Sequence, residues 1–131
     1  MPETKSRPKK RPKKTSAANT YNIATQMANF ALEKKAEDIV LLDLKGLTDM
    51  ADFFIIATGS SDQHVKAIVD NIRDGFKIVG KPWHIEGLSN LKWVLLDYVD
   101  IVVHVFDKET REFYDIERLW ADAKVTVVSD E

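Results

Sequence analysis

The sequence predicts an α/β fold in which a mixed sheet of about five strands is flanked by helices. Two segments, residues 19–35 and 60–79, carry apolar residues at helical spacing. Short runs of branched and aromatic residues occur at 39–44, at 53–57 and in a pair that begins at Trp93. Such runs are typical of buried strands. A chain of 131 residues has room for one compact domain.

The first helix is expected to begin near Asn19 or Thr20, either of which can cap it, and to run to about Lys35. Its apolar stripe consists of Ile23, Met27, Phe30 and Ala31. The strands at 39–44 and 53–57 follow, with eight residues between them. A connection of that length is too short for a crossover helix, so we expect these two strands to be antiparallel.

A second helix is expected next, because Ser60 with Gln63 three residues later resembles a capping box. Its stripe consists of Val65, Ile68, Val69, Ile72, Phe76 and Val79. Gly80 and then Pro82 should end this helix. A short strand is expected at 82–86, reached by a right-handed crossover if it runs parallel to the preceding strand.

The next two strands are expected to form an antiparallel hairpin, because two apolar runs flank the short loop 97–100. Side chains alternate along a strand, so Trp93 and Asp97 share one face of the first strand. His104 and Phe106 share one face of the second strand for the same reason. If these faces coincide, the hairpin presents an aromatic ring, an imidazole and a carboxylate side by side.

Residues 109–120 are expected to form one or two short helical turns that pack Phe113, Ile116 and Leu119 against the sheet. The ordered domain should therefore span residues 19–123, and residues 124–131 should form a short C-terminal tail.

The N-terminal segment differs from the rest of the chain in charge. Residues 1–14 hold seven bases and one acid, a net charge of +6, which leaves 12 bases and 20 acids, a net charge of −8, for residues 15–131. Prolines and the lack of apolar residues predict a disordered basic tail over residues 1–18. Such an arm can contact RNA phosphates through counterion release; the alternative is a solvated tail or the remnant of a transit sequence. The candidate RNA-contacting residues are Lys9, Lys10, Arg11, Lys13 and Lys14.

Several classes of protein are excluded by composition. The absence of cysteine excludes a disulfide framework, a thiolate metal site and a cysteine nucleophile. The apolar runs are far shorter than the roughly twenty residues that span a bilayer, and the N-terminus lacks the apolar segment of a secretory signal, so we expect a cytoplasmic protein. His64 and His84 have no partner at metal-ligand spacing, and we expect neither a metal nor a cofactor.

An enzyme is the alternative that the sequence disfavours. The turn at 58–61 resembles the phosphate-holding turn of nucleotidyltransferases, whose backbone N–H groups bind the anion. Those enzymes also hold magnesium with strand-borne carboxylates spaced Asp-x-Asp, a spacing that occurs nowhere in the chain. Asp97 and Asp100 are expected to form a turn instead, and Ser60 and Ser61 to act as caps. We therefore expect no catalysis, and keep a nucleotidyltransferase-like enzyme or nucleotide-binding protein as the alternative.

Four separated motifs resemble the Iojap family, the ribosomal silencing factors. They are Ala-Glu-Asp-Ile-Val at 36–40, the run 51–61, Glu-Gly-Leu at 86–88 and the run 93–120, in the order of the family over roughly residues 20–121. The resemblance implies a nucleotidyltransferase-like fold. It also implies a translational repressor that binds the large ribosomal subunit through ribosomal protein uL-fourteen and sterically blocks joining of the small subunit. With that partner, the basic tail would face ribosomal RNA.

The resemblance also implies partner-binding positions within the last motif. We expect Trp93 and Tyr98 to reach the partner and Trp120 to be mainly structural. For His104, contact with a partner and a place in the core both remain open. The candidate partner-binding residues are Trp93, Asp97, Tyr98, His104, Phe106, Tyr114 and Leu119. The protein is expected to be a monomer or a weak homodimer.

Overall fold

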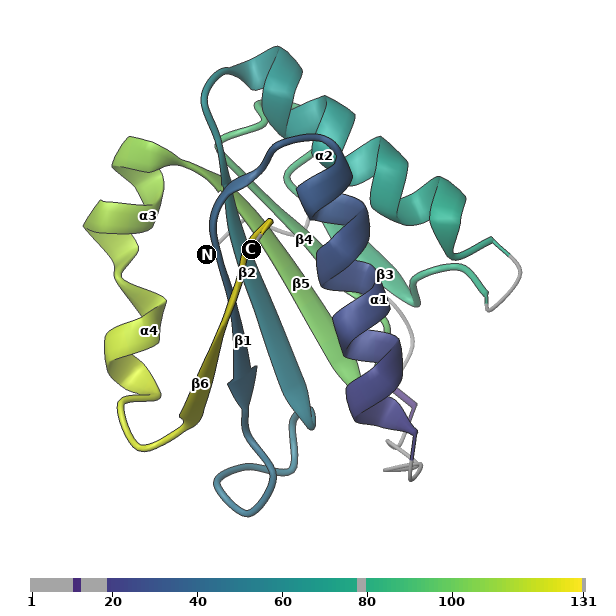
Figure 1. Cartoon of the computed structure of the whole chain (residues 1–131), viewed down its shortest axis with the longest axis vertical. Coiled ribbons are helices and arrows are strands. Elements are labelled where there is room, and N and C mark those ends of the chain that lie inside the picture. The colour runs from purple at the N-terminus through teal and green to yellow at the C-terminus, as the bar shows by residue number, and fades with distance from the viewer. Residues whose placement is uncertain (1–10, 13–18, 78–79, 131) are drawn as a thin grey trace.

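The computed structural model describes residues 11–12, 19–77 and 80–130. The strands are β1 Glu37–Asp43, β2 Phe53–Gly59, β3 His84–Glu86, β4 Trp93–Asp97, β5 Ile101–Asp107 and β6 Lys124–Val128. The helices are α1 Thr20–Glu33, α2 Asp62–Gly75, α3 Lys108–Tyr114 and α4 Ile116–Leu119. Figure 1 shows α1 and α2 on one side of the sheet and α3 and α4 on the other. The predicted α/β fold is confirmed, with six strands rather than about five.

The sheet is mixed, with the order β3-β4-β5-β2-β1-β6. Its central pair, β2 and β5, is parallel, and every other pair is antiparallel. The antiparallel pairing of β1 with β2 and the β4–β5 hairpin were both predicted. Strand β3 pairs with β4 at the edge of the sheet, and two strands, β4 and β5, separate it from β2. All seven residues of β2 are buried, as expected for a strand covered on both faces.

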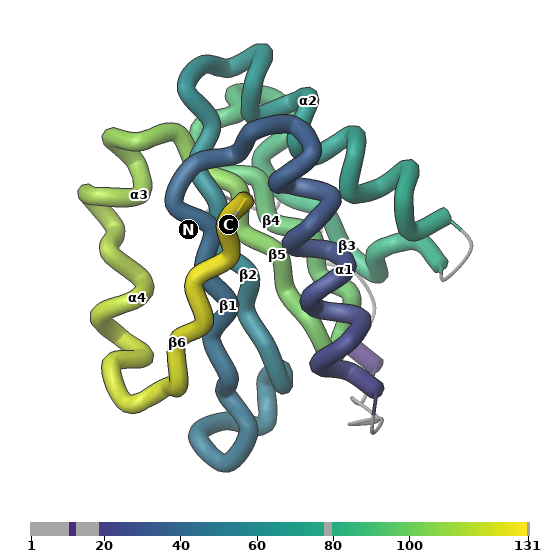
Figure 2. Tube along the Cα trace, viewed as in Figure 1, coloured from purple at the N-terminus to yellow at the C-terminus, as the bar shows by residue number. Residues whose placement is uncertain are grey.

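Residues 124–128 form the edge strand β6, so the prediction of a C-terminal tail there was wrong. The strand is antiparallel to β1, with Val125 opposite Leu42 and Val127 opposite Val40. Backbone pairing holds it in place, while Val125 remains 53% exposed and Val127 71% exposed. A strand that buries so little gives no clear hydrophobic signal. Figure 2 follows this last stretch of chain alongside β1.

Helix α1 begins where the sequence predicted, with Asn19 at the N-cap position, and its predicted apolar face lies on the core. Its buried positions include Met27 and three alanines, whereas Ile23 and Phe30 are only half-buried. The alanines are Ala24, Ala28 and Ala31. Small side chains on the inner face allow the helix to pack closely on the sheet.

Helix α2 differs from the prediction at both ends. Its N-cap is Ser61, whose hydroxyl accepts a hydrogen bond of 3.1 Å from the backbone N–H of His64. The predicted cap at Ser61 is therefore confirmed, and the predicted capping box at Ser60 was wrong. The helix ends at Gly75, earlier than predicted. A Cβ atom on Gly75 would come within 2.6 Å of the Phe30 ring, so glycine lets this ring pack closely where α1 and α2 make contact.

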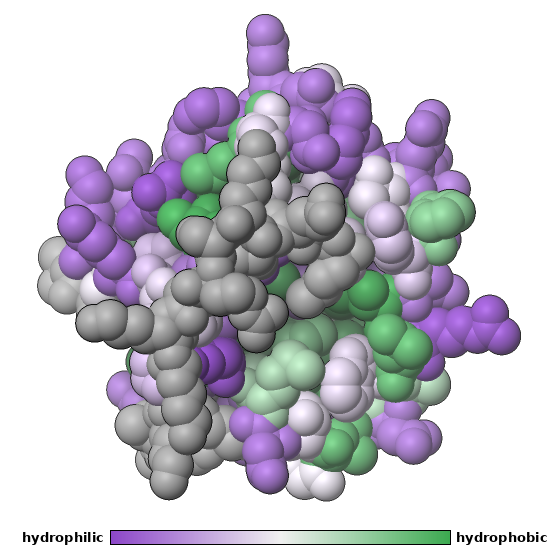
Figure 3. All heavy atoms as spheres, turned by 180° about the vertical axis from the view of Figure 1, so that it is seen from behind, coloured by the Kyte–Doolittle hydropathy of each residue, from purple (hydrophilic) through white to green (hydrophobic). Residues whose placement is uncertain are grey.

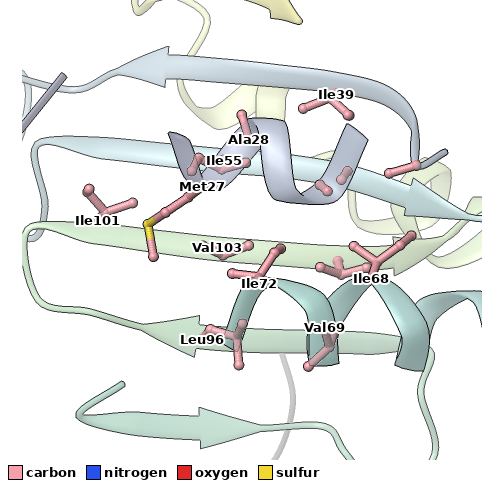
Figure 4. Packing of buried hydrophobic residues seen from close by; sticks show 14 of the residues in the cluster. Met27, Ala28, Ile39, Ile55, Ile68, Val69, Ile72, Leu96, Ile101 and Val103 are labelled. Carbon is pink, nitrogen blue, oxygen red and sulfur yellow. The ribbon is translucent and has the colours of Figure 1, made fainter. Parts of the chain in front are cut away.

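The main core lies between the sheet and helices α1 and α2. Figure 4 shows Met27 of α1 and Ile72 of α2 over the strand residues Ile55 and Val103. A second, smaller cluster lies on the opposite face of the sheet, beneath α3 and α4, and includes Trp93. In the part of the chain that the structure describes, no helix is long and apolar enough to cross a membrane.

Candidate functional site

Two large apolar side chains are exposed on the short helices α3 and α4. Phe113 is 79% exposed and Leu119 is 75% exposed, so the prediction that both pack into the core was wrong. Asp115 separates the helices in a left-handed conformation, with φ of 44°. This break reorients α4, and only Ile116 of the two helices becomes buried. Figure 3, seen from behind, shows hydrophobic surface on the side of the molecule where α3 and α4 lie.

Tyr114 connects this exposed surface to the core. Its side chain is 45% exposed, and its ring lies edge-on to Phe113 at 5.0 Å and 4.9 Å from the ring of Trp93. Trp93 itself is only 6% exposed and packs on Phe106 at 4.7 Å. The structure therefore places Trp93 and Phe106 below the surface, where they support Tyr114. We expected Trp93 to reach outward.

The ring of His104 lies in the same buried layer. The indole Nε1–H of Trp93 donates to Nδ1 of His104 over 3.1 Å, and the ring of Phe54 lies 4.6 Å away. His104 is 3% exposed, and burial lowers its pKa to about 3, so the imidazole is neutral at physiological pH. Its Nε2, which must carry the proton, is buried without a hydrogen-bond partner in the described structure. Of the two interpretations left open by the sequence, the geometry favours the core.

Asp97 and Tyr98 lie at the opposite end of the hairpin from α3. Asp97 accepts the backbone N–H of Val99 over 2.8 Å, in the turn expected from the sequence. It also accepts two hydrogen bonds from Arg11, at 2.7 and 2.9 Å. Tyr98 is half-buried beside Phe76, and burial raises the pKa of its phenol. The structure thus separates these two candidates from Tyr114 and Leu119.

One important residue, Arg111, was missed by the sequence analysis. Its guanidinium donates to both carboxylate oxygens of Glu117, at 3.0 and 3.1 Å, and so joins α3 to α4. A further nitrogen donates to the Asp38 carbonyl at 2.7 Å and to the Thr58 hydroxyl at 2.8 Å. Arg111 therefore fixes the two short helices to each other and to strands β1 and β2. Its spacing to Glu117, six residues apart, is not that of neighbours on one helix, so no local pattern revealed the pair.

An acidic groove of about 490 Å³ lies between α3–α4 and strand β1. Its charged lining comprises four acids, Asp38, Glu112, Asp115 and Glu117, and two bases, Lys108 and Arg111. We call Phe113, Tyr114 and Leu119, together with Glu112 and Asp115, the α3–α4 surface. It combines exposed apolar side chains with adjacent negative charge.

The turn at 58–61 is occupied by contacts within the chain. Ser61 caps α2, and the backbone N–H of Ser60 donates to Nδ1 of His64 at 2.8 Å. The other ring nitrogen of His64 donates to the Lys34 carbonyl at 2.7 Å, at the C-terminal end of α1. Within residues 11–12, 19–77 and 80–130, no group of three or more acidic or histidine side chains is placed to hold a metal ion. The Ser60 N–H and the Ser61 hydroxyl, which a nucleotide phosphate would need, are thus already hydrogen-bonded within the chain.

The chain also matches a known family. The model described as "Ribosomal silencing factor during starvation" matches residues 16–131. The chain belongs to the ribosomal silencing factor family. The ribosomal silencing factor of Bacillus subtilis is 45% identical over 92 residues, which is 70% of this chain and 78% of that protein. The chloroplastic protein Iojap of Zea mays is 36% identical over 107 residues, 81% of this chain and 46% of that protein.

Solved structures support the same assignment. A crystal structure of a Chromobacterium violaceum protein has a TM-score of 0.72 at 35% identity, covering 76% of this chain and 85% of that chain. One from Bacillus halodurans has a TM-score of 0.68 at 39% identity, covering 76% of this chain and 94% of that chain. Membership of this family makes the protein a regulator of translation associated with the ribosome.

Proposed function

We propose that this ribosomal silencing factor binds the large ribosomal subunit through the α3–α4 surface and sterically blocks joining of the small subunit. The observation that carries the proposal is the exposure of Phe113 and Leu119 on helices that Arg111 joins to each other and to strand β2. Large apolar side chains presented on a fixed support are typical anchors of protein interfaces. Holding them in place before binding reduces the entropy lost on association.

The charge of this surface indicates the kind of partner. Glu112 and Asp115 line the acidic groove and are next to Phe113 and Tyr114 in the sequence, so the surface suits a basic protein with an apolar depression. Ribosomal protein uL-fourteen, which the family resemblance implied, is our proposed partner. Trp93 and Phe106 contribute indirectly, because the Trp93 ring supports Tyr114 from below and itself packs on Phe106. No chemical step is needed, since occupancy of the joining face is enough to silence the subunit.

Co-sedimentation with separated ribosomal subunits tests the proposal. The protein should pellet with large subunits and not with small ones, and the double variant Phe113→Ala, Leu119→Ala should lose at least about tenfold in affinity, or 1.4 kcal/mol. The control is Leu47→Ala, Met50→Ala, which removes two other exposed apolar side chains, 44% and 50% exposed, from the β1–β2 loop. Equal loss in both doubles, or binding to both subunits, contradicts the proposed surface.

The steric step requires a second measurement. Light scattering of mixed subunits should show less joining as the protein is added, and the Phe113, Leu119 double variant should restore joining. Binding of the large subunit with unchanged joining would separate the docking site from the repressor mechanism.

A further inference from the structure

The two edge strands of the sheet differ in how well they are protected. The sheet ends in β3 on one side and in β6 on the other (Figure 1). Natural edge strands are kept from pairing with other chains by shortness, proline, bulges or charge. Strand β3 has three residues and closely follows Pro82, whereas β6 has five residues and contains no proline. Strand β6 is therefore the edge that is more open to another strand.

The outer edge of β6 is regular and suited to pairing. Its ladder with β1 has no bulge, from Ile39 opposite Val128 to Asp43 opposite Lys124. Four of its five residues are valine or threonine, which favour strands. In an antiparallel ladder only alternate residues direct their N–H and C=O groups to one neighbour, so the other groups of β6 point away from β1. Within the described residues no strand pairs with that side of β6.

One face of β6 is apolar and in contact with water. Val125 and Val127 share this face and are 53% and 71% exposed. Their neighbours across the ladder, Leu42 and Val40, belong to the second core cluster or pack against it. The side chains of β6 therefore extend that cluster to the margin of the sheet. A strand paired with the outer edge of β6 would cover them from the open side.

The charges at the two ends of this segment are complementary to each other. Lys124 begins the strand, Asp130 follows it by two residues, and both are exposed. Among the residues that the structure describes, neither has an ion-pair partner. If two copies pair antiparallel about Val127, Lys124 of each copy lies opposite Asp130 of the other. A pairing centred on Thr126 would instead place Asp122 opposite Asp130, two like charges.

We propose that two copies of this chain associate through β6, as an antiparallel pair centred on Val127, so that their sheets become one continuous sheet. The partner is a second copy because the segment is self-complementary: it carries a cation and an anion in the order that a two-fold antiparallel pair requires. One strand from each copy makes a small interface, so we expect a weak association. Strand β6 is not part of the α3–α4 surface, and this association is independent of the proposed function.

Sedimentation equilibrium of the full chain at concentrations up to about 1 mM tests the pairing. A monomer–dimer equilibrium is expected, and Val127→Lys should raise its dissociation constant at least about tenfold, because like charges then meet at the centre. Val127→Thr keeps a branched, uncharged side chain and should remain within about threefold of the parent. So should Leu47→Lys, which adds the same charge at another exposed apolar position. A monomer at every concentration, or equal weakening by Val127→Lys and Leu47→Lys, would overturn the proposal.

Exchange of the charges tests the register. Lys124→Asp and Asp130→Lys should each weaken self-association at least about fivefold at low salt, since each variant opposes like charges at both ends of the pair. A mixture of the two variants should associate about as tightly as the parent, because each then meets the opposite charge in its partner. The matched mixture is Lys45→Asp with Asp49→Lys, which changes the same charges at exposed positions of the β1–β2 loop. A first mixture no tighter than its components, or equal association in the second, contradicts the pairing.

Two further measurements separate this association from folding and from subunit docking. Thermal unfolding of each variant shows whether lost association is lost folding. Lys124 lies opposite Asp43 in the ladder, so if Lys124→Asp fails to fold, the comparison of Val127→Lys with Leu47→Lys decides. The Phe113→Ala, Leu119→Ala variant should self-associate as the parent does. A dimer lost in that variant would assign self-association to the α3–α4 surface and overturn the proposal, whereas its affinity for the large subunit tests only the proposed function.

Discussion

The indole of Trp93 donates its only N–H to Nδ1 of His104, across the β4–β5 hairpin, over 3.1 Å. Trp93 is paired with Phe106 and His104 with Leu95, so the two rings are diagonal neighbours on one face of the hairpin. Both are almost completely buried. The hydrogen bond requires Nδ1 as an acceptor, and a protonated imidazole has none.

The first prediction concerns pH. The folded-state pKa of His104 is lowered by burial to about 3, whereas an unfolded chain keeps the ordinary value near 6.5. The unfolded state therefore binds the extra proton first, so stability is greatest above pH 6.5 and falls as the pH drops towards 3. At pH 5 this loss should be about 2 kcal/mol relative to pH 7.5.

Urea unfolding of the parent and of His104→Gln at both pH values checks this. The glutamine carbonyl can still accept from Trp93 but does not titrate, so the variant should lose most of the pH dependence. If the free energy of unfolding of the variant changes with pH as much as that of the parent, other titratable groups cause the pH dependence.

The second prediction separates two neighbouring serines. Ser61 caps α2 through its hydroxyl, so Ser61→Ala should reduce the free energy of unfolding by about 1 kcal/mol. Ser60→Ala should cost less, because the backbone N–H of Ser60 still donates to His64 after the substitution. Chemical denaturation of the two variants gives the comparison, and a larger cost at Ser60 would return the cap to the residue that the sequence suggested.

The third prediction tests Arg111 as the residue that positions α3 and α4. Arg111→Lys keeps the charge but cannot reproduce the four hydrogen bonds of the guanidinium. We expect a loss of about 1–3 kcal/mol in stability and a clear loss of large-subunit affinity. Arg118→Lys, an exposed arginine on α4, is the matched control and should change neither quantity. Unchanged affinity in Arg111→Lys would show that docking does not depend on this support.

The fourth prediction compares two glycines with similar backbone geometry. Gly87 has φ of 91°, and a Cβ atom there would lie 1.9 Å from the Trp93 carbonyl oxygen. Gly46 has φ of 85°, with nothing within 4 Å of such an atom. Gly46→Ala should therefore cost only the backbone strain, about 1 kcal/mol, whereas Gly87→Ala should cost at least about 3 kcal/mol. Similar melting temperatures for the two variants would rule out the close approach at Gly87.

The elements with strong periodicity were predictable. Alternation and loop length identified the β4–β5 hairpin, and helical spacing identified α1 and α2. The exposure of Phe113 and Leu119 was not predictable. In a helix of only one or two turns, the spacing of the apolar residues does not distinguish a buried residue from an exposed one. The ion pair of Arg11 with Asp97 joins residues 86 positions apart and leaves no local trace.

The second core cluster suggested the site but did not locate its surface. Trp93, His104 and Phe106 were candidate partner-binding residues because they are aromatic or polar residues within strands. The structure places all three beneath the surface. Of the candidate partner-binding residues, Tyr114 and Leu119 are exposed, and so is Phe113, which was not among the candidates. The basic residues Lys9, Lys10, Lys13 and Lys14 and the expected disorder over 1–18 lie outside the described residues, apart from Arg11 and Pro12.

Helix α3 buries none of its own residues, in contrast to β2, which is buried throughout. Its attachment depends on the Asp107 cap, the Arg111 hydrogen bonds and the Tyr114 ring. Segments with so little burial open locally, and the free energy of this opening is well below that of global unfolding. We therefore expect backbone amides of α3 to exchange with deuterium long before those of β2, and to become protected on the large subunit. The apparent affinity for the large subunit is then proportional to the fraction of molecules in which α3 is closed.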